Sequence, residues 1–154
     1  MYMPISFEGT VEDYHNLLKG VQLWDVGVER QIQIKGPDAE ALSQFLTPRN
    51  IKKCSKGQAM YAPFLDFKGG FINDPVMLKI DEDCYWFSLA DGDALLWAQG
   101  IAAGYKFDVD IREPDVSPLQ AQGPNSKELM AKVFGDWVND LGFYRFKEVN
   151  HEGI

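Results

Sequence analysis

Hydrophobic positions near the start of the chain follow a helical period. The residues that recur at the three-to-four-residue spacing of an amphipathic helix are Val11, Tyr14, Leu17 and Leu18. Thr10, followed three residues later by Asp13, resembles a capping box in which Asp replaces the usual Glu. Because Gly20 is a typical helix end, the pattern predicts a helix over 10–19 that the Thr10 side chain caps.

The next hydrophobic residues alternate with polar ones, which is the period of a half-buried strand. Segments 21–26 and 30–35 have this pattern and are close in sequence, so we expect two strands that pair with each other. Gly36-Pro37-Asp38 then opens a helix, because proline suits the first turn and an acid suits the positive end of the helix dipole. The expected buried positions of this helix are Ala41, Leu42, Phe45 and Leu46.

Two apolar runs, 58–66 and 71–80, flank the tetrapeptide Phe67-Lys68-Gly69-Gly70. Glycine adopts the positive φ values that a tight loop requires without steric cost. The two runs are therefore predicted to form a long hairpin.

The rest of the chain mixes strands and helices. The expected elements are a strand over 85–89, a helix from Asp91 or Asp93 to Gly104, a strand over 105–111, a strand over 119–122 and a helix opened by Gly123-Pro124-Asn125. Hairpins without a regular alternation of strand and helix favour an α+β fold, with antiparallel or mixed sheets and packed helices, over a doubly wound parallel sheet.

An internal similarity links two strand-to-helix turns. Residues 32–39 and 119–126 share the order apolar, Gln, apolar, polar, Gly, Pro, Asp or Asn, and a small residue. Two interpretations stay open at this point. The segments are halves of a pseudo-repeat, or Gly-Pro-Asx is simply a good strand exit and helix entry that occurs twice.

Composition narrows the classes of function. The chain has 154 residues, of which 45% are hydrophobic and 25% charged, so we expect one folded domain over 1–154. Lys+Arg 15 against Asp+Glu 23 gives a net charge of -8, which disfavours nucleic acid and anionic membrane surfaces as partners. The N-terminus has no signal-peptide pattern and no long apolar segment follows, so we expect a cytoplasmic protein.

Residues that often carry chemistry are scarce. Cys54 and Cys84 are not part of a Cys-x-x-Cys pair and are expected to be reduced, packed thiols. His15 and His151 are isolated, so we expect them to be solvated rather than metal ligands. The motifs of phosphate loops, dinucleotide sites, zinc proteases and serine hydrolases are absent from the sequence.

The most unusual local sequence is Asn73-Asp74-Pro75 within an apolar strand pattern. A carboxylate there is costly unless it has a partner or a ligand, and Pro75 cannot donate to a strand ladder. One interpretation is a bulge at a sheet edge, with the Asp74 carboxylate bonded to nearby backbone. The other is a carboxylate that accepts a hydrogen bond from a flat heterocycle or stabilises a cation, with Tyr61 sharing the site from across the hairpin.

Several separate motifs occur together along the chain. They are Trp24-Asp25-Val26, the segment 34–39, Tyr61, Gly69-Gly70-Phe71-Ile72-Asn73-Asp74 and the segment 115–125. In this order they resemble the first half of the folate-binding domain of the glycine cleavage T-protein (aminomethyltransferase) family. Val28-Glu29-Arg30-Gln31, Asn73-Asp74-Pro75-Val76 and the segment 88–97 resemble the dimethylsulfoniopropionate demethylase branch of that family.

The resemblance implies a site and a reaction. It implies that Asp74 is catalytic, with its carboxylate near the one-carbon position of tetrahydrofolate, and that Tyr61, Asn73 and Asp74 bind this cofactor. The implied reaction moves a methyl group from the sulfonium of dimethylsulfoniopropionate to N5 of tetrahydrofolate. Asn73 stands where aminomethyltransferases carry a further Asp, and Gly27-Val28 stands where they usually carry Ser-His, which disfavours glycine-cleavage chemistry.

The resemblance also implies that the chain is the N-terminal part of a longer enzyme, too short to be active alone. Three functions stay open: a methyltransferase fragment, an aminomethyltransferase, and a non-catalytic folate-binding or structural module. A partial domain leaves an apolar face uncovered, which predicts a homodimer through that face.

Overall fold

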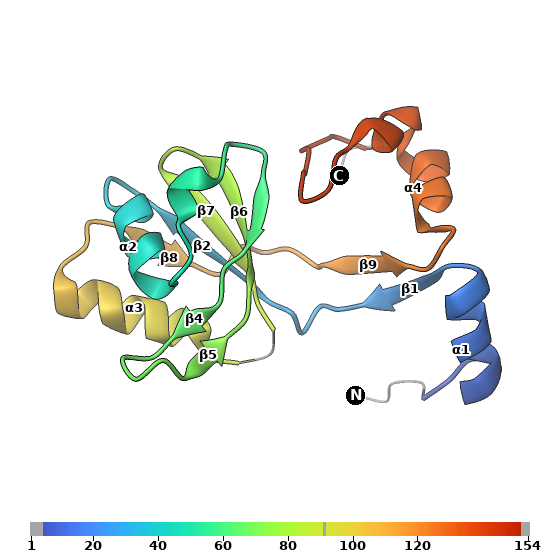
Figure 1. The fold of residues 1–154 in the computed structure, drawn as a ribbon, viewed down its shortest axis with the longest axis horizontal. Helices are drawn as coiled ribbons and strands as arrows, with labels where there is room; N and C mark the ends of the chain where they lie inside the picture. The colour runs from blue at the N-terminus through green and yellow to red at the C-terminus, as the bar shows by residue number, and fades with distance from the viewer. Residues whose placement is uncertain (1–4, 91, 152–154) are drawn as a thin grey trace. The chain divides into compact units, whose positions relative to one another are not determined.

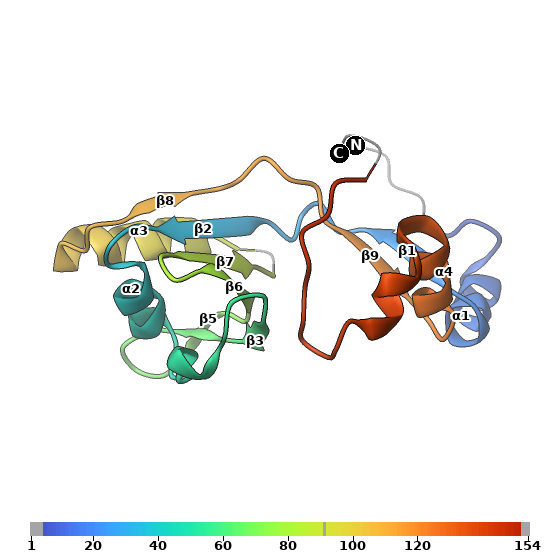
Figure 2. The same cartoon turned by 90° about the horizontal axis from the view of Figure 1, so that it is seen from above.

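The computed structural model describes residues 5–90 and 92–151, and its mixture of helices with antiparallel strands confirms the α+β prediction (Figures 1 and 2). The chain forms two compact units. Unit 1 comprises Met1–Val26, Pro118–Leu141 and Asn150–Ile154, and unit 2 comprises Gly27–Ser117 and Gly142–Val149.

Unit 1 consists of helices and one two-stranded sheet. Its elements are α1 (Thr10–Lys19), β1 (Gln22–Asp25), β9 (Leu119–Gln122), α4 (Ser126–Phe134) and the 3-10 helix η2 (Asp136–Asp140). β1 and β9 pair antiparallel, with Gln22 opposite Gln122 and Asp25 opposite Leu119. The predicted helix over 10–19 and strand over 119–122 are confirmed.

Unit 2 holds the larger sheet. Its elements are β2 (Gln31–Lys35), α2 (Ala39–Leu46), the 3-10 helix η1 (Ile51–Lys53), β3 (Ala59–Tyr61), β4 (Phe64–Leu65), β5 (Phe71–Asn73), β6 (Val76–Asp81), β7 (Cys84–Ser88), α3 (Ala94–Tyr105) and β8 (Asp110–Arg112). Five strands form an antiparallel sheet in the order β3-β6-β7-β2-β8, and β4 pairs with β5 separately.

The hydrophobic core of unit 2 lies between the five-stranded sheet and the helices α2 and α3 (Figures 1 and 2). Ile32 and Ile34 of β2, with Phe87 of β7, face Leu42 of α2 and Ala98 of α3 in one buried cluster. Burial of apolar side chains in a core of this kind is the main source of stability for a folded domain.

The predicted pairing of the two early strands is wrong. β1 pairs with β9, whereas β2 pairs with β7 on one edge and β8 on the other. Alternation of polar and apolar residues determines which face of a strand is buried, but it does not determine the neighbouring strand. Both edges of β2 are occupied by strands that lie far away in sequence.

The two Gly-Pro-Asx turns have the same backbone structure. Gly36 and Gly123 adopt φ of 138° and 132°. Within each turn a backbone N–H bonds the glycine carbonyl: Ala39 N donates to Gly36 O and Ser126 N donates to Gly123 O, both at 3.1 Å. In each turn the N–H of the Asp or Asn also bonds a distant carbonyl: Asp38 N donates to Asp108 O at 3.2 Å, and Asn125 N donates to Gly20 O at 3.1 Å. In each turn the glycine lies against the backbone of a neighbouring segment, so both positions exclude a side chain. Both interpretations, a pseudo-repeat and a helix entry that occurs twice, are consistent with this correspondence.

The predicted capping box at the start of α1 is wrong. Gly9 occupies the N-cap position, and Thr10 is the first residue of the helix. The Asp13 carboxylate instead accepts a hydrogen bond from Phe7 N at 2.8 Å. Asp13 therefore holds the chain that enters the helix rather than closing a box with Thr10.

Helix α3 runs past its predicted end. It continues through Tyr105, and Lys106 follows in the left-handed conformation with φ of 62°. Phe107 N then bonds back to Ala102 O at 3.0 Å, so the following strand, β8, starts only at Asp110. Asp93 occupies the N-cap position, whereas Asp91 lies outside the described residues. None of the helices in the described part of the chain is long and apolar enough to cross a membrane.

Candidate functional site

The predicted long hairpin is confirmed, but it is divided between two sheets. β3 pairs with β6 in the five-stranded sheet, and β4 pairs with β5 beyond it. The change occurs where Ala62-Pro63 lies opposite Asp74-Pro75, because proline has no N–H to donate to the ladder. One backbone bond crosses this break, from Ala62 N to Pro75 O at 3.0 Å.

Asp74 lies in the break and is exposed. Within residues 5–90 and 92–151 its carboxylate makes no hydrogen bond or ion pair, so the predicted bond from Asp74 to nearby backbone is absent. An exposed carboxylate on a rigid backbone can accept a hydrogen bond from a ligand without first losing a protein partner.

Tyr61 begins a row of residues that crosses the sheet beside Asp74. Tyr61 lies opposite Val76, Val76 opposite Ser88, and Ser88 opposite Gln31. Residues directly opposite in antiparallel strands point to the same face of the sheet. Tyr61 is 38% exposed, and Gln31 Nε2 donates to Ser88 Oγ at 2.9 Å. Asp74 comes two residues before Val76, so it lies next to this row.

A second row, two residues further along, brings an aromatic ring to the same face. It runs from Leu78 to Trp86 to Gln33, and Trp86 Nε1 donates to Gln33 Oε1 at 3.1 Å. We call this surface the polar sheet face and define it by Tyr61, Trp86, Ser88, Gln31 and Gln33. It is opposite the core face, which carries Met77 and Phe87.

Sequence reasoning missed Trp86 and Gln33 as members of the site. The signal was the alternation in β7, where Tyr85 and Phe87 are buried in the core and Trp86 must point the other way. Gln33 is only 6% exposed, and a buried amide requires hydrogen-bond partners. The row itself depends on which strands are neighbours, which the sequence pattern does not specify.

The side chain of Asn73 bonds to backbone at the edge of the site. Asn73 is 6% exposed. Its Oδ1 accepts from Ala90 N at 3.1 Å, and its Nδ2 donates to Ala90 O at 3.1 Å. Asn73 thus links the end of β5 to the residues that follow β7, and its predicted contact with a ligand stays a prediction.

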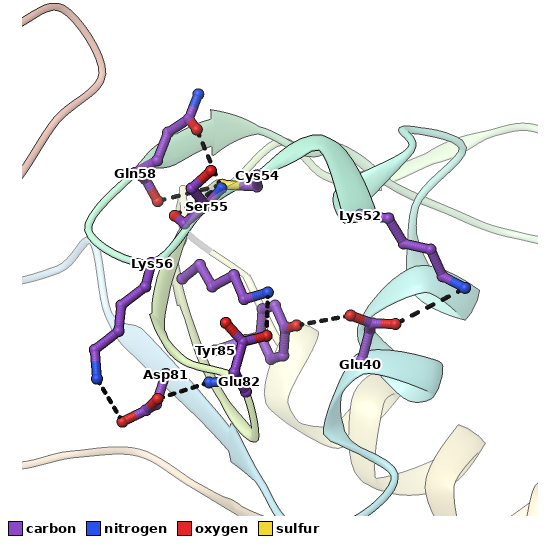
Figure 3. Close-up of polar contacts among 10 residues, drawn as sticks. Glu40, Lys52, Cys54, Ser55, Lys56, Gln58, Asp81, Glu82 and Tyr85 are labelled. Atoms are coloured by element: carbon purple, nitrogen blue, oxygen red, sulfur yellow. Dashed lines mark hydrogen bonds and ion pairs between the residues drawn. The ribbon is translucent and has the colours of Figure 1, made fainter.

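A cluster of charged residues lies on the core face, and Figure 3 draws its Glu40, Glu82 and Tyr85 side chains. Lys79 Nζ donates to Glu82 Oε2 at 2.8 Å and lies 5.8 Å from the centre of the Tyr85 ring. The Tyr85 hydroxyl donates to Glu40 Oε2 at 3.4 Å. The hydrogen bond to Glu82 raises the pKa of Lys79 although burial opposes it, and burial raises the pKa of Tyr85. The cluster connects α2 to the β6–β7 turn and is separate from the polar sheet face.

The cysteines and histidines lie elsewhere. Cys54 and Cys84 are buried and free, which confirms the prediction of packed thiols, and burial raises the pKa of each. His15 is exposed, and the His151 ring packs edge-on against Phe134 at 4.9 Å. Among the residues that the structure describes, no group of three or more His, Cys, Asp or Glu side chains could hold a metal ion.

Comparison with known proteins decides the family. A family model described as the GCVT N-terminal domain matches residues 1–154. The chain belongs to this family. The match confirms the resemblance to the glycine cleavage T-protein family that the sequence motifs indicate.

Relatives of this GCVT-family chain include both named branches. It is 46% identical over 154 residues to dimethylsulfoniopropionate demethylase DmdA of Ruegeria pomeroyi, covering 100% of this chain and 42% of that protein. It is 28% identical over 156 residues to an aminomethyltransferase of Chlorobium limicola, covering 98% of this chain and 43% of that protein. The chain thus spans about two fifths of the length of these relatives.

A solved structure shares the fold. The glycine cleavage system aminomethyltransferase T from Bartonella henselae matches 93% of this chain and 40% of that chain, with a TM-score of 0.83 and 20% sequence identity. At this identity the match shows the fold alone, and it agrees with the α+β architecture of the GCVT-family chain.

Proposed function

We propose that this chain is part of an enzyme that transfers a methyl group from dimethylsulfoniopropionate to tetrahydrofolate. The proposal is supported by the 46% identity to a dimethylsulfoniopropionate demethylase over the whole chain. The observation that carries it is the position of Asp74, an exposed carboxylate at a proline-interrupted break beside Tyr61 and the polar sheet face.

The residues present are chemically suited to a folate. Asp74 offers an acceptor for a ring N–H, Tyr61 offers a hydroxyl, and Trp86 adds a flat apolar surface on the same face. When bound, tetrahydrofolate supplies the nucleophilic nitrogen that accepts the methyl group. In this proposal Asp74 is the catalytic residue, Tyr61 and Asp74 contact the cofactor, and Asn73 belongs to this chain's part of the cofactor site through its bonds to Ala90 beside Asp74.

The scarcity of acid–base residues is consistent with this reaction. When the sulfur–carbon bond of a sulfonium breaks, its electron pair stays on sulfur and a neutral thioether leaves. The leaving group therefore needs no general acid, and most of the catalysis comes from orientation and exclusion of water. In the proposed reaction Asp74 would stabilise the positive charge that passes from sulfur to nitrogen with the methyl group, and the proton displaced from that nitrogen would leave to water.

Calorimetric titration with tetrahydrofolate tests the proposal. Asp74→Asn should weaken binding by about tenfold or more, since it removes a charged hydrogen-bond acceptor. The matched control is Asp83→Asn, which makes the same charge change at an exposed residue of the β6–β7 turn and should leave the affinity within about twofold. Absence of binding by the wild type at millimolar tetrahydrofolate, or equal affinities for wild type and Asp74→Asn, would refute the proposed site.

NMR with methyl-labelled dimethylsulfoniopropionate then tests the reaction. Transfer of the label to tetrahydrofolate supports the methyltransferase proposal. Binding without transfer would instead favour a non-catalytic folate-binding module.

A second candidate is aminomethyl transfer. It is favoured by the 28% identity to an aminomethyltransferase over 98% of the chain. Label transfer from an aminomethyl donor, with none from dimethylsulfoniopropionate, would replace the first proposal with this one.

We also propose that unit 1 pairs with a second copy of the chain. Every residue of α1 and α4 keeps part of its surface exposed, and Val11, Leu18 and Val133 are each about half exposed or more. A two-stranded sheet is marginally stable unless something packs against it. Sedimentation equilibrium should therefore give twice the 17.4 kDa chain mass, and a clean monomer would contradict the dimer.

We also propose that the protein is cytoplasmic. The two buried, free cysteines, Cys54 and Cys84, support this proposal, because reduced thiols are typical of a reducing compartment. The net charge of -8 supports a partner that is a small molecule rather than a nucleic acid. Cell fractionation with an antibody to the native protein checks the compartment.

A further inference from the structure

The register of β6 and β7 identifies the residue that should pair with Ala90. Val76 lies opposite Ser88 and Leu78 lies opposite Trp86. In an antiparallel ladder residue numbers fall along one strand as they rise along the other. Continuing this register two residues beyond the pair Val76–Ser88 would therefore place Asp74 opposite Ala90. The ladder stops before that position, at Pro75.

The side chain of Asn73 fills the place that the Asp74 backbone leaves. Opposite residues in a hydrogen-bonded antiparallel pair exchange two bonds, one N–H donated in each direction. The Asn73 amide makes both with Ala90, accepting at Oδ1 and donating from Nδ2, each at 3.1 Å. The Asn73 amide also lies beside Gly92, where a Cβ would be in van der Waals contact with Nδ2 at 3.4 Å.

Asp74 is consequently held from both sides. On one side Asn73 is fixed by its bonds to Ala90 and by its backbone pairing with Phe64. On the other side Pro75 is buried, has a fixed φ, and accepts a bond from Ala62 N at 3.0 Å. Neither constraint uses the Asp74 side chain.

We propose that Asn73 is a positioning residue whose side-chain amide replaces the Asp74 backbone in the β6–β7 ladder and keeps the Asp74 carboxylate outside the sheet, available to the ligand. Asn73 thus acts through Asp74 rather than by touching the cofactor. The consequence for binding rests on the proposed function, whereas the ladder replacement does not.

Asn73→Asp separates the two halves of this interaction. The carboxylate keeps an acceptor for Ala90 N–H but loses the donor, and it brings an oxygen against Ala90 O. The chain offers a matched control in Gln44, whose amide also bonds backbone, donating to Arg49 O at 2.7 Å and accepting from Ile51 N at 3.2 Å. Gln44→Glu makes the same chemical change away from Asp74.

A double-mutant cycle on tetrahydrofolate affinity tests whether Asn73 acts through Asp74. Asn73→Asp should weaken binding by about fivefold or more in the wild-type background and by less than about twofold in the Asp74→Asn background. Gln44→Glu should stay within about twofold in both. Equal losses in the two backgrounds, or an Asn73→Asp variant that binds like the wild type, would overturn the proposal.

Amide NMR of the protein without ligand keeps the two proposals distinguishable. Asn73→Leu should remove the exchange protection of Ala90 N–H, and Asn73→Asp should shift the Asp74 amide signal while Gln44→Glu leaves it in place. If the wild type does not bind tetrahydrofolate, the proposed function fails and this measurement alone judges the role of Asn73. Unchanged Ala90 protection in Asn73→Leu would overturn it.

Discussion

Removal of the Glu82 carboxylate should destabilise unit 2 more than removal of the Lys79 charge with which it pairs. The Lys79 side chain is 7% exposed and the Glu82 side chain is 77% exposed. Glu82→Ala therefore leaves a buried ammonium without the carboxylate at 2.8 Å, whereas Lys79→Met removes the buried charge and keeps an apolar chain of similar length.

The exposure of the two side chains determines the expected loss of stability. A hydrogen bond between charged groups contributes about 1.5–3 kcal/mol, and the exposure of Glu82 reduces this, so Glu82→Ala should lower the free energy of unfolding by about 1–2 kcal/mol. Lys79→Met should change it by less than about 1 kcal/mol. Because the pKa of Lys79 is raised in the folded state, this stabilisation is complete below the ordinary lysine pKa and is lost as the pH rises through the folded value.

Urea unfolding, followed by the NMR signals of the five-stranded sheet at pH 7 and at a pH above the lysine range, measures these effects. Asp81→Asn is the control, since its pair with Lys56 is exposed on both sides and should contribute little. A larger loss for Lys79→Met than for Glu82→Ala would refute the reasoning. So would a Glu82→Ala effect that does not diminish at alkaline pH.

Two further predictions concern the fold. Gly36→Ala should lower the free energy of unfolding in urea by about 2–3 kcal/mol, because its φ is 138° and a Cβ would lie 2.8 Å from Asp108 O. The control Gly69→Ala, where φ is 84° and a Cβ would meet nothing within 4 Å, should lower it by only about 1 kcal/mol. Equal losses would contradict the close approach at Gly36. Cys54 and Cys84 should react with iodoacetamide much more slowly in the native protein than in urea at pH 8, because burial raises both pKa values and blocks access, and equal rates would contradict their packing.

Local features of the fold could be predicted from the sequence. The bounds of α1 and β9, and the helix entries after Gly36-Pro37-Asp38 and Gly123-Pro124-Asn125, follow from the pattern of nearby residues, whose chemistry is visible in the sequence. The same locality explains why Asp74 was identified as unusual.

Features that depend on distant segments could not be predicted. The partner of β1 is β9, almost a hundred residues away, and the alternation within β1 is compatible with many partners. Asp13 has two ways to bond backbone, and the fold selects Phe7 rather than Thr10. The role of Asn73 requires Ala90, and the role of Trp86 requires the row from Tyr61, so both depend on strand neighbours.

One NMR titration tests the central claim most directly. When tetrahydrofolate is added to the labelled protein, the account predicts that the amide signals of Tyr61 and Asp74 and the indole N–H of Trp86 shift together with one dissociation constant. Signals of the core-face cluster around Lys79 should stay in place. No shifts at millimolar tetrahydrofolate, or shifts confined to residues away from the polar sheet face, would contradict the proposed folate site.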